Sequence, residues 1–299
     1  MRNKKRQLAA QEAMNYMIVE ARRVLFGGTT GERIVTTTDA GSFGLNLVKA
    51  AIILGTGWGD VLLNEMRLSW SCPLVEIPGF EYLKELQELG AHKRILTIAD
   101  INGKTVAMMR GRIHLNESHD KERLFRAARL QIEMLMELGI EHFILTNATG
   151  SLRPSIKVGD TVAYDSFVLP PMFEPLLWGG EFESPEDVLK DENILKIQGA
   201  AEEAELKCHR GTLGYVRGPS FEGRKKDKQN LRANGADTAG MSIAPECSVL
   251  ALDPKCKVYA VGFITNTDSE EHSDETNRER AKQSSDKLGQ LLLNLISSL

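Results

Sequence analysis

Residues 141–152 read Glu-His-Phe-Ile-Leu-Thr-Asn-Ala-Thr-Gly-Ser-Leu, an apolar run that passes directly into small and hydroxylated residues. The run from Phe143 to Leu145 is typical of a buried parallel strand, and Thr146 to Ser151 are expected to form a loop at its carboxyl end. In open α/β sheets, ligands bind beyond the carboxyl ends of the strands, where small residues let backbone amides approach an anion. The segment therefore predicts the floor of a ligand site, or else a tight strand-to-helix turn that requires small side chains.

The composition is that of a globular protein with one large core or two smaller ones. Hydrophobic residues make up 42% of the 299 residues and charged residues 26%, which is enough apolar material for an α/β protein. The net charge of -4 produces no field that would attract nucleic acid or an anionic membrane, so neither is an expected partner. No stretch approaches the ~20 apolar residues that span a bilayer.

The cysteines are scattered along the chain, at Cys72, Cys208, Cys247 and Cys256. No two of them have the close spacing that is typical of a metal site, and their spacing does not indicate a disulfide framework. We therefore expect reduced, mostly buried thiols, no metal and a cytoplasmic protein.

The first 45 residues are expected to form a helix and a connector that pack on the main domain, residues 46–299. Glu12 and Glu20 argue against a transit peptide, which would be poor in acidic residues. One apolar helical face is predicted from Leu8, Ala10, Met14, Met17, Ile18, Ala21 and Leu25.

A second apolar strand is predicted from Val48 to Leu54, and it ends in Gly55-Thr56-Gly57-Trp58-Gly59-Asp60. The alternating glycines partly match a dinucleotide-binding loop, but Asp60 stands where that fingerprint needs its third glycine. A phosphate-sized anion, held by backbone amides and the Thr56 hydroxyl, fits the loop better.

Two strand-like runs, Lys93 to Ala99 and Lys104 to Arg110, flank Asn102-Gly103, which is a strong hairpin signal. The hairpin leads into Gly111-Arg112-Ile113-His114-Leu115-Asn116-Glu117. In an extended segment, Arg112, His114 and Asn116 point to one face, and arginine and histidine are both suited to phosphate oxygens. The alternative is a solvated strand edge.

The rest of the chain is predicted to alternate between helices and strands. Asp120 can cap a helix that ends at Gly139. The residues from Pro170 to about Pro185 form a long irregular excursion, which is typical of a lid, an oligomer contact or disorder. The other expected elements are a strand at Val158 to Val168, a helix at Asp191 to Leu206, a strand at Gly211 to Arg217 and a closing amphipathic helix, without chemistry, at Glu275 to Leu299.

Six short motifs, in order from about Ala50 to Asn277, resemble those of the trimeric purine nucleoside phosphorylases of the nucleoside phosphorylase superfamily. The resemblance implies a single α/β domain with a central mixed sheet flanked by helices. The motifs are Gly55-Thr56-Gly57-Trp58-Gly59, Gly111-Arg112-Ile113-His114, Thr146-Asn147-Ala148-Thr149-Gly150, Gly218-Pro219-Ser220-Phe221-Glu222, residues 235–246 and Ile264-Thr265-Asn266.

The resemblance also implies phosphate-dependent cleavage of 6-oxopurine nucleosides by a homotrimer, with inorganic phosphate as co-substrate and no other cofactor. The residues expected to bind phosphate are Thr56, Arg112, His114, the Ala148 amide and Ser242. The residues expected at the base and ribose are Asn116, Phe221, Glu222, Met241, Thr265 and Asn266. His114, Glu222 and Asn266 are the expected catalytic residues, with Glu222 accepting from N1-H and Asn266 supporting the charge that develops at N7 and O6.

Two positions depart from the family pattern. Asn116 stands where a tyrosine usually lies beside the ribose, and Arg278 falls where a histidine near the 5′-hydroxyl is common. Sugar recognition is therefore the open part of the prediction. The alternatives are a related phosphorylase or hydrolase with altered sugar specificity and a non-catalytic purine or nucleoside sensor. A neighbouring subunit could be reached by Phe173 or Phe182 of the long excursion.

Overall fold

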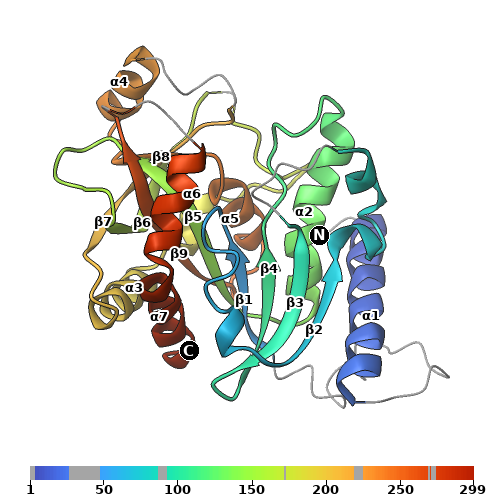
Figure 1. Cartoon of the computed structure of the whole chain (residues 1–299). Coiled ribbons are helices and arrows are strands. Elements are labelled where there is room, and N and C mark those ends of the chain that lie inside the picture. The colour runs from blue at the N-terminus through green and yellow to red at the C-terminus, as the bar shows by residue number, and fades with distance from the viewer. Residues whose placement is uncertain are drawn as a thin grey trace.

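The computed structural model describes residues 4–26, 48–86, 93–171, 173–218, 225–268, 270 and 274–299, and the following statements concern this part of the chain. A nine-stranded mixed sheet forms its centre, with strand order β2-β3-β4-β1-β5-β8-β7-β6-β9. Helices pack on the sheet, as Figure 1 shows. The predicted α/β fold with a mixed sheet is confirmed. Within the same ranges, no helix combines the length and the apolar character needed to cross a bilayer.

The strands are β1 (Val48–Leu54), β2 (Arg67–Pro73), β3 (Ile95–Ile101), β4 (Lys104–Arg110), β5 (His142–Ser151), β6 (Thr161–Val168), β7 (Cys208–Tyr215), β8 (Thr238–Gly240) and β9 (Lys257–Thr267). The α-helices are α1 (Lys4–Phe26), α2 (Lys121–Glu137), α3 (Asp191–Glu203), α4 (Lys225–Ala233), α5 (Ala244–Leu250), α6 (Asp274–Gln283) and α7 (Ser285–Ser297). Because β4, β1, β5 and β9 are parallel neighbours, their carboxyl ends meet at one edge of the sheet.

β5 is longer than predicted and organises the sheet. The residues expected to form a loop, Thr146 to Ser151, continue the strand because β9 pairs with β5 along its whole length. On the opposite side, β1 pairs only as far as Leu145, and β8 begins to pair at Gly150. The backbone of residues 146–149 therefore has no strand partner on that side, which leaves room there for a ligand.

The hairpin of β3 and β4 is confirmed. The strands pair from Ile101 opposite Lys104 onward. Asn102 (φ 52°) and Gly103 (φ 77°) adopt the left-handed conformations that a tight hairpin turn needs. β3 begins at Ile95 rather than at Lys93, because Arg94 is also left-handed, with φ 49°.

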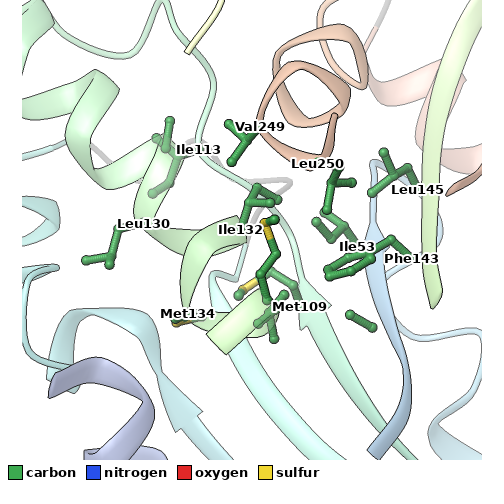
Figure 2. Packing of buried hydrophobic residues seen from close by; sticks show 14 of the residues in the cluster. Ile53, Met109, Ile113, Leu130, Ile132, Met134, Phe143, Leu145, Val249 and Leu250 are labelled. Carbon is green, nitrogen blue, oxygen red and sulfur yellow. The ribbon is translucent and has the colours of Figure 1, made fainter. Parts of the chain in front are cut away.

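Two apolar cores cover the two faces of the sheet. Alternate residues of β1 belong to different cores, Ile53 to the first and Ile52 to the second, as the two-residue period of a strand requires. Figure 2 shows the first core, where Ile53 and Phe143 of the sheet lie near Ile132 of α2 and Leu250 of α5. The second core includes residues of α3 and α7.

The N-terminal helix packs on α2 and β2, as the prediction of a packing helix requires. Four of the predicted face residues, Ala10, Met14, Met17 and Ile18, are buried. Leu8, which was assigned to the same apolar face, is 55% exposed, so that assignment is wrong. Leu8 lies before Ala10, the first buried side chain that the structure describes in this helix. The side chains of Ala21 and Leu25 lie outside the described part of the chain.

The C-terminal segment is not the single closing helix that was predicted. α6 ends at Gln283 and α7 begins at Ser285, with Ser284 between them. The buried leucines, Leu288 among them, belong to α7, whereas α6 consists almost entirely of polar residues. The two helices therefore contact different surroundings, and only α7 serves as a core helix.

The four cysteines are thiols rather than disulfides, and Cys72, Cys247 and Cys256 are buried. Burial raises the pKa of Cys247 and raises the pKa of Cys72 to about 11, and in both cases a nearby glutamate adds to the effect. The thiols of Cys72 and Cys247 are thus protonated and unreactive near neutral pH.

Arg129 of α2 ties the long excursion to the body of the protein. Its guanidinium is 1% exposed, donates to Glu133 on the same helix and to the Leu176 carbonyl (2.8 Å), and forms two hydrogen bonds to Glu181 (2.6 and 2.9 Å). The ring of Trp178 lies against it, 4.5 Å away. One buried cation thus holds residues 176–181 on α2.

Replacing Arg129 with methionine is expected to lower the free energy of unfolding by about 3–5 kcal/mol, because Glu133 and Glu181 lose the cation that balances their buried charges. Arg126, three residues earlier on α2, pairs with Glu122 while both side chains are at least 70% exposed. Arg126→Met is the matched control and should cost at most about 1 kcal/mol. Denaturant unfolding measures both changes, and equal losses would contradict this account of Arg129.

Candidate functional site

A pocket lies beyond the carboxyl ends of β4, β1, β5 and β9, at the edge where the sequence predicted a ligand site. Its walls come from the residues after β1 and β4, from β5 and β9, from the turn after β8 and from α6. Most of the predicted site residues line it together: Thr56, Arg112, His114, Ala148, Met241, Ser242, Thr265 and Asn266. This placement is a structural finding, whereas the roles of these residues in binding and catalysis stay predictions.

Three predicted residues are not placed in this pocket. Phe221 and Glu222 lie outside the described residues. Asn116 does not line the pocket, and its side-chain Nδ2 lies instead 3.7 Å from the position of a Cβ on Gly218. Its Oδ1 is buried and has no hydrogen-bond partner within the described ranges. The predicted shared wall of Arg112, His114 and Asn116 is therefore correct for the first two only, because residues 111–117 are not a regular strand.

The loop after β1 is held tightly against β5. A Cβ on Gly55 would lie 2.6 Å from the Thr146 carbonyl oxygen, so only glycine fits there. The Gly55 amide donates to the Thr146 hydroxyl (3.0 Å), and the Trp58 indole donates to the Asn147 carbonyl (3.1 Å). These contacts fix the loop that carries Thr56 beside the unpaired edge of β5.

Arg112 is a buried side chain that lines the pocket, and it is held from three directions. Its Nη1 donates to Glu246 of α5 (2.9 Å), and its Nη2 donates to the carbonyls of Ile53 (3.3 Å) and Thr146. Burial lowers the pKa of the Arg112 guanidinium, which Glu246 opposes, and an arginine remains charged in either case. A rigid cation thus faces the pocket, with its charge balanced from behind by a carboxylate.

The turn that carries Met241 and Ser242 is strained. Ile243, the next residue, is fully buried and has φ 78°, a conformation that is rare for a β-branched side chain. Such strain costs on the order of 1–3 kcal/mol and persists only where the surroundings enforce it. The turn connects Ser242 in the pocket to the helix that carries Glu246, so one short segment positions a polar lining residue and the partner of Arg112.

Asn266 lies across β5 at the end of β9. A Cβ on Gly150 would come within 3.2 Å of its Oδ1, so glycine at position 150 makes space for the amide. The Thr265 hydroxyl donates to the same Oδ1 (3.4 Å). Behind it, Arg280 of α6 donates to the Thr265 carbonyl (2.6 Å). The Thr265 contact favours an orientation in which the Asn266 Nδ2 is the group presented to a ligand.

Asn147 and Asn277 line the pocket but were given no role from the sequence. Asn147 accepts a hydrogen bond from the Tyr164 hydroxyl (3.1 Å), and burial raises the pKa of Tyr164, which keeps this hydroxyl a donor. Asn277 is 7% exposed and comes from α6, on which we expected no functional residue. The sequence carried one signal for this helix, since α6 has too few apolar residues to form a core face. Arg278, the neighbouring residue at the position where the family often has a histidine, is exposed.

In the part of the chain that the structure describes, no three His, Cys, Asp or Glu side chains come together in a way that could hold a metal ion. Among the described residues that line the pocket, the polar side chains carry hydroxyl groups, amides, an imidazole and a guanidinium. This donor-rich set is suited to an anion with several oxygen atoms.

Comparison with known proteins assigns the family. Residues 49–297 match the family described as the phosphorylase superfamily. The purine nucleoside phosphorylase of Bos taurus is 28% identical over 270 residues, which cover 84% of this chain and 89% of the bovine protein. The purine nucleoside phosphorylase of Saccharomyces cerevisiae is 28% identical over 241 residues, covering 73% of this chain and 72% of the yeast protein.

The fold is similar to that of a solved structure, isoform 2 of purine nucleoside phosphorylase from Schistosoma mansoni in complex with cytosine and ribose-1-phosphate. The TM-score is 0.77 at 21% identity, over 98% of this chain and 96% of the other. At this identity the similarity supports the fold alone. The family match and the names of the sequence relatives confirm the predicted type of enzyme. Because that match covers most of the chain, this protein belongs to the phosphorylase superfamily.

Proposed function

We propose that this protein cleaves the glycosidic bond of 6-oxopurine nucleosides with inorganic phosphate, giving the free base and ribose 1-phosphate. The observation that carries the proposal is a single pocket that joins a set of anion-binding donors, Arg112, His114, Thr56 and Ser242, to the amide of Asn266. These groups support a site in which phosphate and a purine base bind in the same cavity, with the sugar between them.

In the proposed reaction, a phosphate oxygen forms a bond to C1′ of the sugar as the bond from C1′ to N9 of the purine breaks. The bonding electrons leave with the base, and the sugar has oxocarbenium character in the transition state. Phosphate is itself the nucleophile, so the protein acts by positioning and by stabilising charge. Arg112 suits the first task, because acceptors on β1, β5 and α5 fix its guanidinium before a ligand arrives.

At the base, Asn266 donates through Nδ2 to N7 or O6 as negative charge develops there. Its Oδ1 is engaged by Thr265, which supports this orientation of the amide. Glu222 is proposed to accept the hydrogen bond from N1-H, as the sequence motif suggests, although it lies outside the described residues. The proposed preference for 6-oxopurines therefore rests on the position of Asn266 in the pocket and on the sequence motif that contains Glu222.

The proposal requires inorganic phosphate as co-substrate and no other cofactor. A hydrolase with the same pocket would release free ribose, and a sensor would bind the nucleoside without turnover. Phosphorus NMR of a reaction with inosine distinguishes the three, because only phosphorolysis converts inorganic phosphate to ribose 1-phosphate in step with base release. Four cysteines that form no disulfide fit a reducing compartment, and we propose the cytoplasm.

We also propose that the protein is a homotrimer. Phe173, one of the two aromatic residues considered for a neighbour's site, packs edge-on against Tyr215 of the same subunit, with ring centroids 5.1 Å apart. Phe182 is 87% exposed and is the better candidate. Analytical ultracentrifugation should give about three times the 33.1 kDa chain mass. A fully active monomer would refute the trimer.

Phe182→Ala is expected to weaken nucleoside binding or trimer formation, because a large apolar side chain at this exposure is suited to burial against a partner. Leu195, on α3, is 66% exposed and provides the matched control, Leu195→Ala. Sedimentation and the KM for inosine measure the two effects. Identical behaviour of both variants would remove Phe182 from the proposed contact.

A further inference from the structure

Arg110, the last residue of β4, holds the end of the loop that carries Thr56. Its Nε donates to the Gly59 carbonyl (3.1 Å), and its Nη2 donates to the carboxylate of Asp60. Arg110 is paired in register with Leu54, the last residue of β1, which is the point where the loop leaves the sheet. The side chain of Arg110 is 13% exposed, whereas that of Asp60 is 56% exposed. A largely buried cation therefore contacts both the backbone and a side chain of the loop.

Two other parts of the molecule hold the same loop. At its start, the Gly55 amide donates to a hydroxyl group of β5 (3.0 Å). At Gly57, whose φ is 81°, a Cβ would lie 2.1 Å from the Ala281 Cβ, so the backbone of the loop packs closely on α6. Thr56 lies between these two points, and Arg110 fixes the loop beyond them. Together the three contacts limit where the Thr56 hydroxyl can lie.

We propose that Arg110 is a positioning residue for phosphate, acting through the loop on the Thr56 hydroxyl. Thr56 is among the residues that line the pocket, whereas Arg110 contacts the loop at its far end. The effect of a positioned group falls steeply when the group moves by about 1 Å, so a residue that fixes the loop influences binding without contacting the ligand. This inference deepens the proposed function and rests on it for the identity of the anion.

The contact with the Gly59 carbonyl, rather than the ion pair with Asp60, carries the proposed effect. Asp60 is more than half exposed, and an ion pair at such a position contributes little because water and salt screen it. Lys93 donates to the same carboxylate (3.1 and 3.2 Å), and its side chain is 57% exposed. Lys93→Met therefore removes a cation from Asp60 and leaves the contact between Arg110 and Gly59 in place, which makes it the matched control.

The test measures the Kd of inorganic phosphate by calorimetry on the full chain. Arg110→Met should weaken phosphate binding on the order of tenfold, because the loop is released at one end. Arg110→Lys keeps a charge near Asp60 but lacks the Nε that donates to Gly59, so it should still weaken binding by roughly threefold or more. Lys93→Met should bind phosphate within about twofold of the unaltered protein. In turnover assays of Arg110→Met, the KM for phosphate should rise while the KM for inosine stays within about twofold.

A double-mutant cycle with Thr56→Val separates positioning from a general structural role. If Arg110 acts through the Thr56 hydroxyl, Arg110→Met should have a much smaller effect on the phosphate Kd once that hydroxyl has been removed. Additive losses, equal rises in both KM values, or equal losses in Arg110→Met and Lys93→Met would overturn the inference. Normal phosphate affinity in Arg110→Lys would also overturn it, and this result decides the question even if Arg110→Met does not fold. Phosphate binding without turnover in the unaltered protein would instead refute the proposed function, so the two failures are distinguishable.

Discussion

Arg112→Ala is expected to lower kcat/KM for phosphate on the order of 10²-fold or more, because an ionic hydrogen-bonding group is lost from a buried anion site. Steady-state kinetics with varied phosphate measures the loss. The side chain is 1% exposed and its neighbours hold it rigidly, so a flexible surface cation cannot replace it. An unchanged dependence on phosphate concentration would contradict the role of Arg112.

The same substitution leaves Glu246 buried without its cation, so a loss of stability must be separated from a loss of binding. Glu246 is 4% exposed at its side chain, and removing its partner is expected to cost about 3–5 kcal/mol. In Arg112→Met/Glu246→Gln, both charges are removed and most of that stability should return. Phosphate binding should not return. A double variant with normal phosphate affinity would show that stability, rather than the anion contact, explains the single variant.

The kcat/KM for inosine and for guanosine is expected to exceed that for adenosine by roughly 10⁴-fold. A 6-oxopurine carries N1-H, which the proposed Glu222 carboxylate can accept, whereas adenine presents a bare lone pair to that charge. Sites that read a substrate donor in this way reject an analogue that lacks it, because buried polar groups remain unpaired. Comparable values for adenosine and inosine in the unaltered protein would contradict the assignment of both Glu222 and Asn266.

Asn266→Asp should shift this ratio toward adenosine. An aspartate that accepts from the 6-amino group, or that is protonated, suits adenine better than the amide does. The KM for phosphate serves as the internal control, because Asn266 is proposed to contact the base. A ratio that Asn266→Asp leaves unchanged would contradict the role of Asn266 alone.

The sequence was sufficient to predict the fold wherever a local pattern coincided with the tertiary structure. The apolar run of β1 and the Asn102-Gly103 turn both carry their own signals, and both elements form as predicted. β5 was predicted too short, because Thr146 to Ser151 look like a loop locally. These residues remain a strand because β9 provides a partner along their full length, and no local pattern encodes that pairing.

The site could be predicted only where motifs place residues at strand ends. Arg112 and His114 follow β4 directly and were found in this way. Glu246 lies in the motif of residues 235–246 but was given no role, because it reaches the site through Arg112, which it contacts. Asn277 was missed for a different reason. Its segment was predicted as part of one closing amphipathic helix, whereas α6 is a separate helix that ends at Gln283, and its Asn277 lines the pocket.

The central claim is that phosphate is the nucleophile, and the most direct test is the rate of hypoxanthine release from inosine as a function of phosphate concentration. The buffer must contain no phosphate or arsenate, and bound phosphate must first be removed by dialysis. The account predicts a rate that saturates with phosphate and falls to the background rate in its absence, with one ribose 1-phosphate formed for each base released. Equal base release without phosphate would contradict phosphorolysis and identify a hydrolase.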